Sequence, residues 1–302
     1  MKRGVIIVFS VFVSIYLFSQ QSIEFKSIPY INSLEEFYDG IGLNPAKTGH
    51  RNNHELFAST MFQVNNTDYH NLSVYTVSYN KNFSKVKGGL GFRFNSVTLE
   101  RVAKVQEFMT YYAHPIKSDG KLKLYVGGGI GITGIKSYVN EPVWIFPDMS
   151  DPLVSSGYDP VLALVPGINI GINAEYEKAR VGFAYEKQFF SSKPETGSFD
   201  TTTSAQNFNN RLLLELYYNI SLNESISLAP YTFLYMYGDV GISAGLKANI
   251  KDKYFIASGY NTLFNRTSLT ASVKLFKYVQ MGALYEFDEL YSYTGIVLKG
   301  TF

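Results

Sequence analysis

The sequence predicts an all-β fold, a transmembrane antiparallel β-barrel of about 14 strands with short periplasmic turns and longer extracellular loops. Three observations predict it. Apolar and polar residues alternate with a period of two in one segment after another, and connection lengths alternate between short and long. Aromatic residues make up 16% of the chain, and all but one are Tyr or Phe. Outer-membrane barrels combine these features because each strand faces lipid on one side and the barrel carries aromatic girdles.

Segment 240–250 shows the alternation plainly. Apolar residues occupy every even position from Val240 to Ile250, whereas Gly, Ser, Lys and Asn occupy the odd positions. Successive side chains of a strand point to opposite faces, so this pattern predicts a lipid-facing side and an inward-facing side. Comparable patterns predict fourteen strands, at 54–63, 72–83, 88–96, 103–114, 121–135, 164–176, 179–189, 208–220, 225–236, 240–250, 253–261, 267–275, 278–287 and 291–302.

The connections between these strands carry independent information. Every second gap is brief, as the gaps at 84–87, 177–178 and 276–277 illustrate, and the two longest, 136–163 and 190–207, both fall in the other set. A barrel with a periplasmic N-terminus sorts its loops in this way. A soluble β-sandwich, the alternative for a secreted Tyr-rich chain, has no reason to do so. The last strand ends on Phe302, which resembles the assembly signal of bacterial outer-membrane proteins.

Three parts of the chain are predicted. Residues 1–20 have a basic start, a short apolar run and a small residue near its end, which is typical of a secretory signal peptide; an uncleaved anchor is the alternative. Residues 21–50 are not strand-like and are predicted to form a periplasmic or plug-like N-terminal segment. Residues 51–302 are predicted to form the outer-membrane barrel. Localisation in the bacterial outer membrane follows.

Composition excludes several classes of function. Removal of Lys2 and Arg3 with the signal leaves 25 basic residues against 25 acidic ones, so no nucleic-acid surface is expected. The chain has no cysteine, and its four histidines lack metal-ligand spacing. No Ser stands at a sequence spacing that would pair it with a histidine for nucleophilic catalysis. We therefore expect no metal, no cofactor and no enzymatic activity.

Charged residues recur on the predicted inward faces. Buried charges of mixed sign are normally paired, so an ion-pair network that stabilises the lumen is the favoured interpretation. A selectivity lining for a solute path is the alternative. The predicted lumen residues are Arg93, Glu107, Lys123, Glu175, Glu186, Arg211, Glu215, Lys247, Lys274, Glu286 and Lys299.

The long gap at 136–163 carries an apolar cluster. Val143, Trp144, Ile145 and Phe146 follow one another there, and Trp144 is the only Trp of the chain. Large apolar residues in an extracellular loop have to fold into the barrel mouth, enter the membrane edge or contact a partner. A plug and a partner-binding loop are the two interpretations that remain.

The stretch IGLNPAKTG, at 41–49, is the most motif-like part of the chain. Pro45 fixes φ and biases Asn44 towards an extended conformation, while Gly49 permits a positive φ just before the first strand. These three residues predict an N-terminal elbow that leads into the barrel. We expect Asn44 and Thr48 to hydrogen-bond the local backbone there.

Four short motifs together resemble one family. Asn44, Pro45, Ala46 and Gly49 match its Asn-Pro-Ala-x-x-Gly, although Lys47-Thr48 stands where an aromatic and a small residue are usual. The Gly-rich hairpin, the Tyr-Ala strand and the next Gly-rich strand match at Gly88, Gly89, Gly91, Tyr111, Tyr112, Ala113, Gly127, Gly129 and Gly131. On these residues, and on the hairpin-like stretch at 159–190, the chain resembles the PorP/SprF family of type IX secretion-system membrane proteins.

The resemblance implies a non-enzymatic role in type IX secretion or gliding motility, at the cell surface. It implies binding or anchoring of an exported surface protein, or of its C-terminal domain, with other secretion-system components and outer-membrane lipid as further partners. Fatty-acid-channel proteins also carry an early Asn-Pro-Ala and fourteen strands. An outer-membrane channel for a small or hydrophobic solute is therefore the alternative function.

Overall fold

The computed structural model describes residues 40–50, 54–64, 72–99, 103–117, 120–137, 161–189, 210–237, 239–263, 265–288 and 291–302. A helical turn, α3 (Gly40–Leu43), and a 3₁₀ turn, η1 (Pro45–Lys47), precede the strands. The strands are β1 (Glu55–Gln63), β2 (Leu72–Phe83), β3 (Gly88–Leu99), β4 (Ala103–Lys117), β5 (Leu122–Ser137), β6 (Val161–Tyr176), β7 (Ala179–Gln188), β8 (Asn210–Tyr218), β9 (Ile220–Ser221), β10 (Ile226–Tyr237), β11 (Asp239–Ile250), β12 (Tyr254–Asn261), β13 (Arg266–Phe276), β14 (Val279–Phe287) and β15 (Ser292–Thr301), with a 3₁₀ turn, η2 (Ser84–Val86), after β2.

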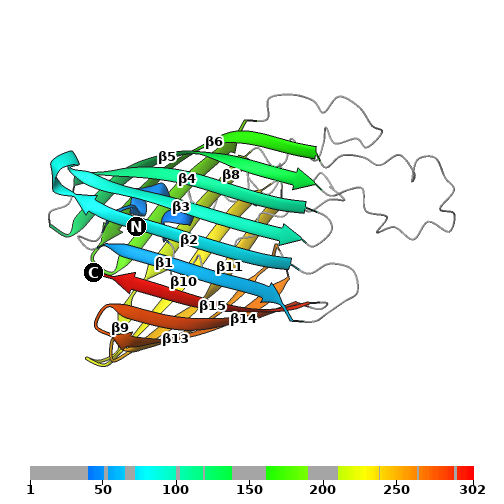
Figure 1. Ribbon diagram of the computed structural model, residues 1–302. Helices are drawn as coiled ribbons and strands as arrows, with labels where there is room; N and C mark the ends of the chain where they lie inside the picture. Colours follow the sequence, from blue (N-terminus) through cyan, green and yellow to red (C-terminus); the bar gives the residue numbers. More distant parts are fainter. Residues whose placement is uncertain are drawn as a thin grey trace, which may run out of the picture.

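The strands form a closed antiparallel barrel (Figure 1). Each strand pairs with its sequence neighbours, and β1 pairs with β15 over nine residues, which closes the ring. The short β9 continues β8 and also pairs with β10, so the fifteen strands occupy fourteen positions around the barrel. The predicted fold class is confirmed, and every predicted strand boundary lies within three residues of the observed one.

The largest differences at the short-turn end occur where the predicted gap at 115–120 turns out to be partly strand. β4 runs through Pro115 to Lys117, and its pairing with β5 shifts register between these two residues. Proline donates no hydrogen bond to a sheet ladder, and a bulge accommodates that loss. The predicted strand ends at residue 114, directly before Pro115, and a central proline normally argues against strand structure.

The short connections lie at one end of the barrel, together with the C-terminus (Figure 1). In outer-membrane barrels this is the periplasmic end. Several of these turns place a non-glycine residue at positive φ, as at Lys87, Glu177 and Asp252. Tight hairpin turns need such conformations because their backbone twist matches the twist of the flanking strands.

The outer face is apolar and the strands alternate as predicted. In β6 the even positions from Leu164 to Ile172 are exposed, whereas the odd positions from Val165 to Asn173 are buried. Aromatic side chains gather on the outer face near both strand ends. Those near the short turns are Phe83, Tyr112, Tyr176 and Tyr218, and those near the opposite end are Phe62, Tyr75, Phe189, Tyr260 and Phe287. Among the described residues, no helix is long and apolar enough to cross a membrane.

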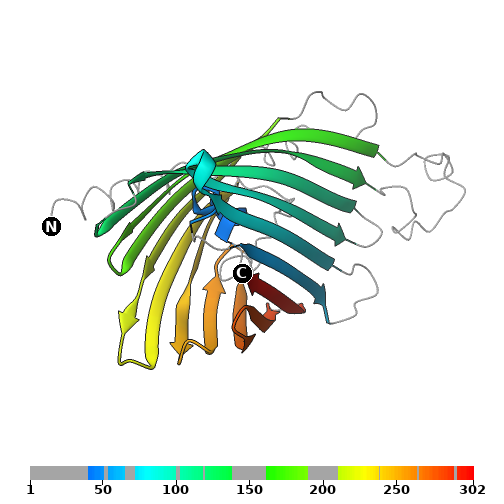
Figure 2. The ribbon, with the colours of Figure 1, turned by 60° about the vertical axis from the view of Figure 1, so that its left-hand side comes forward.

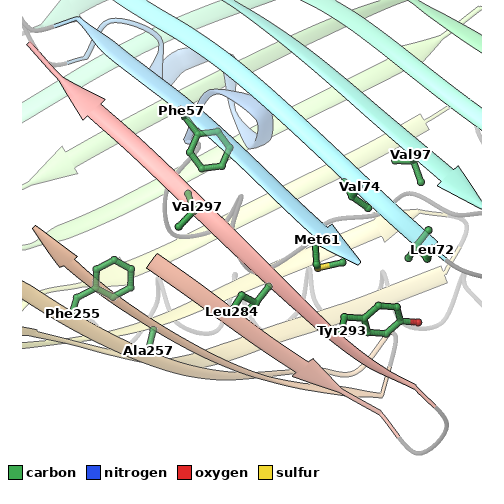
Figure 3. Packing of buried hydrophobic residues seen from close by; sticks show 10 residues of the cluster. All are labelled: Phe57, Met61, Leu72, Val74, Val97, Phe255, Ala257, Leu284, Tyr293 and Val297. Carbon is green, nitrogen blue, oxygen red and sulfur yellow. The ribbon is translucent and has the colours of Figure 1, made fainter. Parts of the chain in front are cut away.

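The interior is partly apolar (Figure 3). Ten buried side chains from the inner faces of β1, β2, β3, β12, β14 and β15 form one cluster: Phe57, Met61, Leu72, Val74, Val97, Phe255, Ala257, Leu284, Tyr293 and Val297. Porin lumens are polar and water-filled. This part of the wall therefore encloses a packed core in place of an aqueous channel lining.

Candidate functional site: the elbow inside the barrel

Residues 40–50, which we name the elbow, lie inside the ring of strands (Figures 1 and 2). Asn44 adopts an extended conformation and caps η1, because its Oδ1 accepts a hydrogen bond from the N–H of Ala46 at 2.9 Å. Pro45 opens η1, a position where a missing N–H costs nothing. Gly49 has a φ of +61° and turns the chain towards β1. The local sequence thus specifies the bend.

Packing holds the elbow against the inner wall. Ile41, Leu43, Asn44, Ala46 and Thr48 are each at most 2% exposed. Leu43 packs in a cluster with inward-facing residues of β7, β8 and β10, and Ile41 packs with two residues of β4. Of the segment 21–50 that was predicted to be periplasmic or plug-like, the described part, 40–50, lies inside the lumen.

Glycines in the wall make room for the elbow. A Cβ added at Gly171 of β6 would collide with Oδ1 of Asn44, and one at Gly127 of β5 would stand 2.5 Å from the backbone N of Ala46. The neighbouring Gly128 faces outward, and a Cβ there would meet nothing closer than 3.7 Å. Three further wall glycines approach the elbow in the same way, Gly89, Gly91 and Gly182. These five glycines therefore form a cradle for the elbow, whereas the inward Gly129 and Gly131 make room for Tyr111 and Met109 of β4.

Hydrogen bonds fix the elbow to three strands. Nδ2 of Asn44 donates to the carbonyl of Ile172 at 3.0 Å, and Nη2 of Arg211 donates to the carbonyl of Gly42 at 3.2 Å. Near the short-turn end, the N–H of Gly49 donates to Oδ1 of Asn80 at 3.1 Å, and Nδ2 of Asn82 donates to the carbonyl of Gly49 at 3.0 Å. β2, β6 and β8 thus contribute directly, beside the glycines of β3, β5 and β7.

The expected local hydrogen bonds are present in part. Asn44 makes its bond to the backbone of Ala46 as predicted. Thr48 bonds locally only through its own N–H, which donates to the carbonyl of Pro45 at 3.1 Å. The predicted local bond of Thr48 is thus made by its main chain, whereas its hydroxyl is buried and has no hydrogen-bond partner among the described residues. Its methyl group instead approaches Gly91, which explains why the side chain points into the wall.

One buried carboxylate ties the elbow to the barrel. Glu215 of β8 is 0% exposed and forms ion pairs with Lys47 of the elbow and with Arg180 of β7, whose Nη2 lies 2.7 Å from Oε1. Nε of Arg180 donates a second bond to the same oxygen at 2.9 Å. Burial lowers the pKa of Lys47, and the Glu215 carboxylate opposes that shift. Buried charges require such pairing because desolvation is costly.

Lys47 and Arg180 are lumen residues that the sequence analysis missed. Arg180 shares the parity of Gly182 and Glu186 on β7, so the alternation alone could have placed it inside. Lys47 stands where the resembling family usually has an aromatic residue, and its pairing with Glu215 gives that departure a structural role.

The predicted lumen charges lie in separate pairs around the wall. Arg93 pairs with Glu107 at 3.1 Å and Arg211 with Glu186, and both pairs lie beside the elbow. The other contacts are Glu175 with His50 at 3.3 Å, Glu286 with Arg266 at 3.4 Å, Lys299 with Glu55 at 3.5 Å, and Lys247 over the ring of Phe255 at 4.3 Å. Lys123 and Lys274 are exposed near the short-turn end. The structure thus brings most of these residues into pairs and leaves two lysines at the rim.

The remaining predicted residues lie elsewhere. Val143, Trp144, Ile145 and Phe146 lie outside the described residues, as does the predicted signal peptide. Within the described ranges, no three His, Asp or Glu side chains come together in a way that could hold a metal ion.

A cavity lies on the side of the barrel away from the cradle, at the short-turn end. It has a volume of about 490 Å³ and is lined by residues of β11 to β15 and of the turns between them, with no elbow residue among the described lining. Lys247, Lys274 and Lys299 line it together with Gln280 and Phe255. The lumen at this end therefore has one half filled by the elbow and one half that is hollow and basic.

Known proteins resemble the chain at two levels. A family model described as type IX secretion system membrane protein PorP/SprF matches residues 37–296. The outer-membrane protein Omp33 of Acinetobacter baumannii has a similar structure, with a TM-score of 0.53 at 8% identity over 84% of this chain and 100% of Omp33. The toluene transporter TbuX of Ralstonia pickettii has a TM-score of 0.51 at 10% identity over 87% of this chain and 93% of TbuX. None of the curated proteins matches the chain.

The match begins three residues before the described part of the elbow and covers most of the barrel. The similar structures are outer-membrane barrels, so the fold and the bacterial outer-membrane location agree with the family match. Chemically, the arrangement around the elbow immobilises a segment of chain inside the barrel and buries its polar groups in ion pairs and hydrogen bonds.

Proposed function

The chain belongs to the type IX secretion system membrane protein PorP/SprF family, and from that premise we propose that it is a non-enzymatic barrel that binds or anchors an exported surface protein, through that protein's C-terminal domain. The observation that carries the proposal is the docked elbow. The elbow fills part of the lumen, which narrows any aqueous path, and it ties several strands together, which stiffens the wall.

The contacts of the elbow support this role. The elbow joins β2, β6 and β8 across the interior through the Asn44, Gly49 and Lys47 contacts. A binding surface built on a rigid scaffold loses less conformational entropy when a partner docks. The barrel wall that carries the longest predicted loops, between β5 and β8, is the wall that the elbow stiffens.

The test is purification from the native outer membrane in a mild detergent, after chemical cross-linking, followed by mass spectrometry. We expect a secreted protein of the type IX pathway to co-purify in a fixed ratio. Solitary barrel in every preparation, with cross-links confined to the chain itself, would contradict the proposal.

The apolar loop residues supply a sharper variant. Trp favours the centre of protein interfaces, where truncation of one side chain costs about 2 kcal/mol or more. We propose that Trp144 contacts the partner, so Trp144→Ala should reduce the co-purified protein by about tenfold or more while the barrel still assembles. Trp144→Phe is the matched control and should retain most of the binding.

A channel for a hydrophobic solute is the second candidate, and the apolar inner cluster favours it. Phe57, Met61, Val74 and Leu284 make this part of the interior apolar, where a porin has polar groups, although they pack against one another. TbuX, which has a similar fold, is described as a toluene transporter. Uptake of toluene by liposomes that contain the purified barrel would favour this function over anchoring, and planar-bilayer conductance would report an aqueous path.

A further inference from the structure

The hollow half of the lumen has an unusual charge. The cavity of about 490 Å³ is lined by five lysines, Lys247, Lys253, Lys274, Lys277 and Lys299, and by a single acidic side chain, Asp252. Glu55 lies just outside this lining and pairs with Lys299 at 3.5 Å. The mature chain was expected to be neutral as a whole, so this excess of positive charge is a local feature of β11 to β15.

Strand register places part of this charge in a row. Lys274 of β13 pairs with Gln280 of β14, and Gln280 pairs with Lys299 of β15. Neighbouring strands lie about 4.8 Å apart, so the two lysine backbones stand about 10 Å apart on either side of the Gln280 amide. Lys247 lies deeper, over the ring of Phe255. The row therefore places two lysines and one amide on adjacent strands, and all three side chains line the same cavity.

We propose that this cavity binds an acidic, carboxylate-bearing peptide segment of a periplasmic partner. The cavity opens at the end of the short turns, which faces the periplasm, and the strands separate its lumen from membrane lipid. Its volume is more than ten times that of a water molecule in the liquid, about 30 Å³. The inward-facing ring of Phe255 adds apolar lining that suits a peptide better than an inorganic anion.

This site is distinct from the surface that holds an exported protein in the proposed function. The elbow does not contribute to the described lining, and the strand ends between which the long connections run lie at the opposite end of the barrel. Binding of a peptide in the cavity and anchoring of a surface protein can therefore be tested independently, and either can fail while the other holds. It assigns a second partner to the periplasmic side of the same barrel.

The test is fluorescence polarisation with the full-length protein in detergent and a fluorescein-labelled hexaglutamate peptide. We expect binding at about 50 mM salt that weakens strongly at about 300 mM, because screening reduces the attraction of the lysine-rich lining. The double variant Lys274→Glu/Lys277→Glu should weaken it by about tenfold or more, because each site loses an attractive charge and gains a repulsive one. Labelled hexaglutamine should not bind.

The matched control is Lys85→Glu/Lys178→Glu, which makes the same change of charge at the same end but on the cradle side of the barrel. It should alter the affinity by about twofold or less. Equal losses in the two double variants would overturn the proposal, because they would report diffuse attraction only. Inorganic phosphate and anionic vesicles are added as competitors at the same concentration of negative charge as the peptide. Displacement by phosphate would overturn the proposal in favour of a small-anion site, and displacement by vesicles would overturn it in favour of a lipid site.

Discussion

The two halves of the lumen differ in how they use the same strand pattern. Between β2 and β8 the inward positions carry glycines and a buried carboxylate, and the elbow fills the space that they leave. Between β11 and β15 the inward positions near the short turns carry lysines around a cavity, and the positions farther along these strands are packed apolar residues. The alternation fixes only which side chains face inward. The size and charge of these side chains decide whether the wall packs against the elbow or leaves room for a ligand.

We expect inward substitutions to be costly on the cradle side and mild at the lysines that line the cavity. The largest effect is expected for Glu215→Gln, which leaves Lys47 and Arg180 without their carboxylate. Loss of one partner from a buried ion pair destabilises by about 3–5 kcal/mol. Urea unfolding in lipid vesicles measures the free energy of unfolding. Trypsin cleavage after Lys47 reports release of the elbow, because Lys47 is buried only while docked.

Glu177→Gln is the control for that variant. Glu177 pairs with Lys121 at 2.6 Å in an exposed turn, and exposed pairs contribute about 1 kcal/mol or less. If Glu215→Gln and Glu177→Gln lowered the free energy of unfolding by the same amount, the buried carboxylate would have no central role in holding the elbow.

The next effect is expected for Gly127→Ala. The new methyl group would collide with the backbone of Pro45 and Ala46, and overpacking of this kind costs about 1–3 kcal/mol. Gly128→Ala on the outer face of the same strand should leave stability nearly unchanged and trypsin cleavage after Lys47 absent. If the two variants released the elbow equally, the glycines would not be a cradle.

A smaller loss is expected for Asn44→Ala. The substitution removes the cap of η1 and the bond to the carbonyl of Ile172, which together are worth about 1–2 kcal/mol. Hydrogen exchange at Ala46, whose N–H loses its acceptor, measures the local effect. Unchanged exchange at Ala46 would show that the side chain of Asn44 does not hold the turn.

The smallest effect is expected in the hollow half. Lys274→Gln changes an exposed lysine at the rim and should alter the free energy of unfolding by about 0.5 kcal/mol or less. The same urea titration measures it. A loss as large as that of Glu215→Gln would mean that the lysines of this half stabilise the barrel, which would weaken the case for a binding cavity.

The strands could be predicted from the sequence because each depends on a local pattern of period two. The docking of the elbow could not, because it depends on contacts between residues far apart in the chain, such as Asn44 and Ile172. One signal was available. Gly127 and Gly171 fall on inward positions of neighbouring strands, where a missing side chain leaves space that something else must fill.

Charge pairs show the same limit. Alternation places Glu215 and Arg211 inside, but it cannot say that Lys47, from outside the strands, completes the site at Glu215. The sequence pattern also did not show that three of the predicted lumen lysines line one common cavity. Lys247, Lys274 and Lys299 lie on three different strands, and only the register of the closed sheet brings them to one place.

Disulfide cross-linking tests the docked elbow most directly. The chain contains no cysteine, so two introduced cysteines have no native thiol in the chain to pair with. A Cβ added at Gly91 would stand 3.0 Å from Cγ2 of Thr48, which is within reach of a disulfide. We expect Thr48→Cys/Gly91→Cys to oxidise almost completely in intact outer membranes and to resist alkylation by maleimide until it is reduced. We expect no cross-link for Thr48→Cys/Ser272→Cys, whose second site lies on the inner face of β13 in the hollow half. Free thiols in the first pair, or equal cross-linking in both, would contradict an elbow fixed on the cradle side of the barrel.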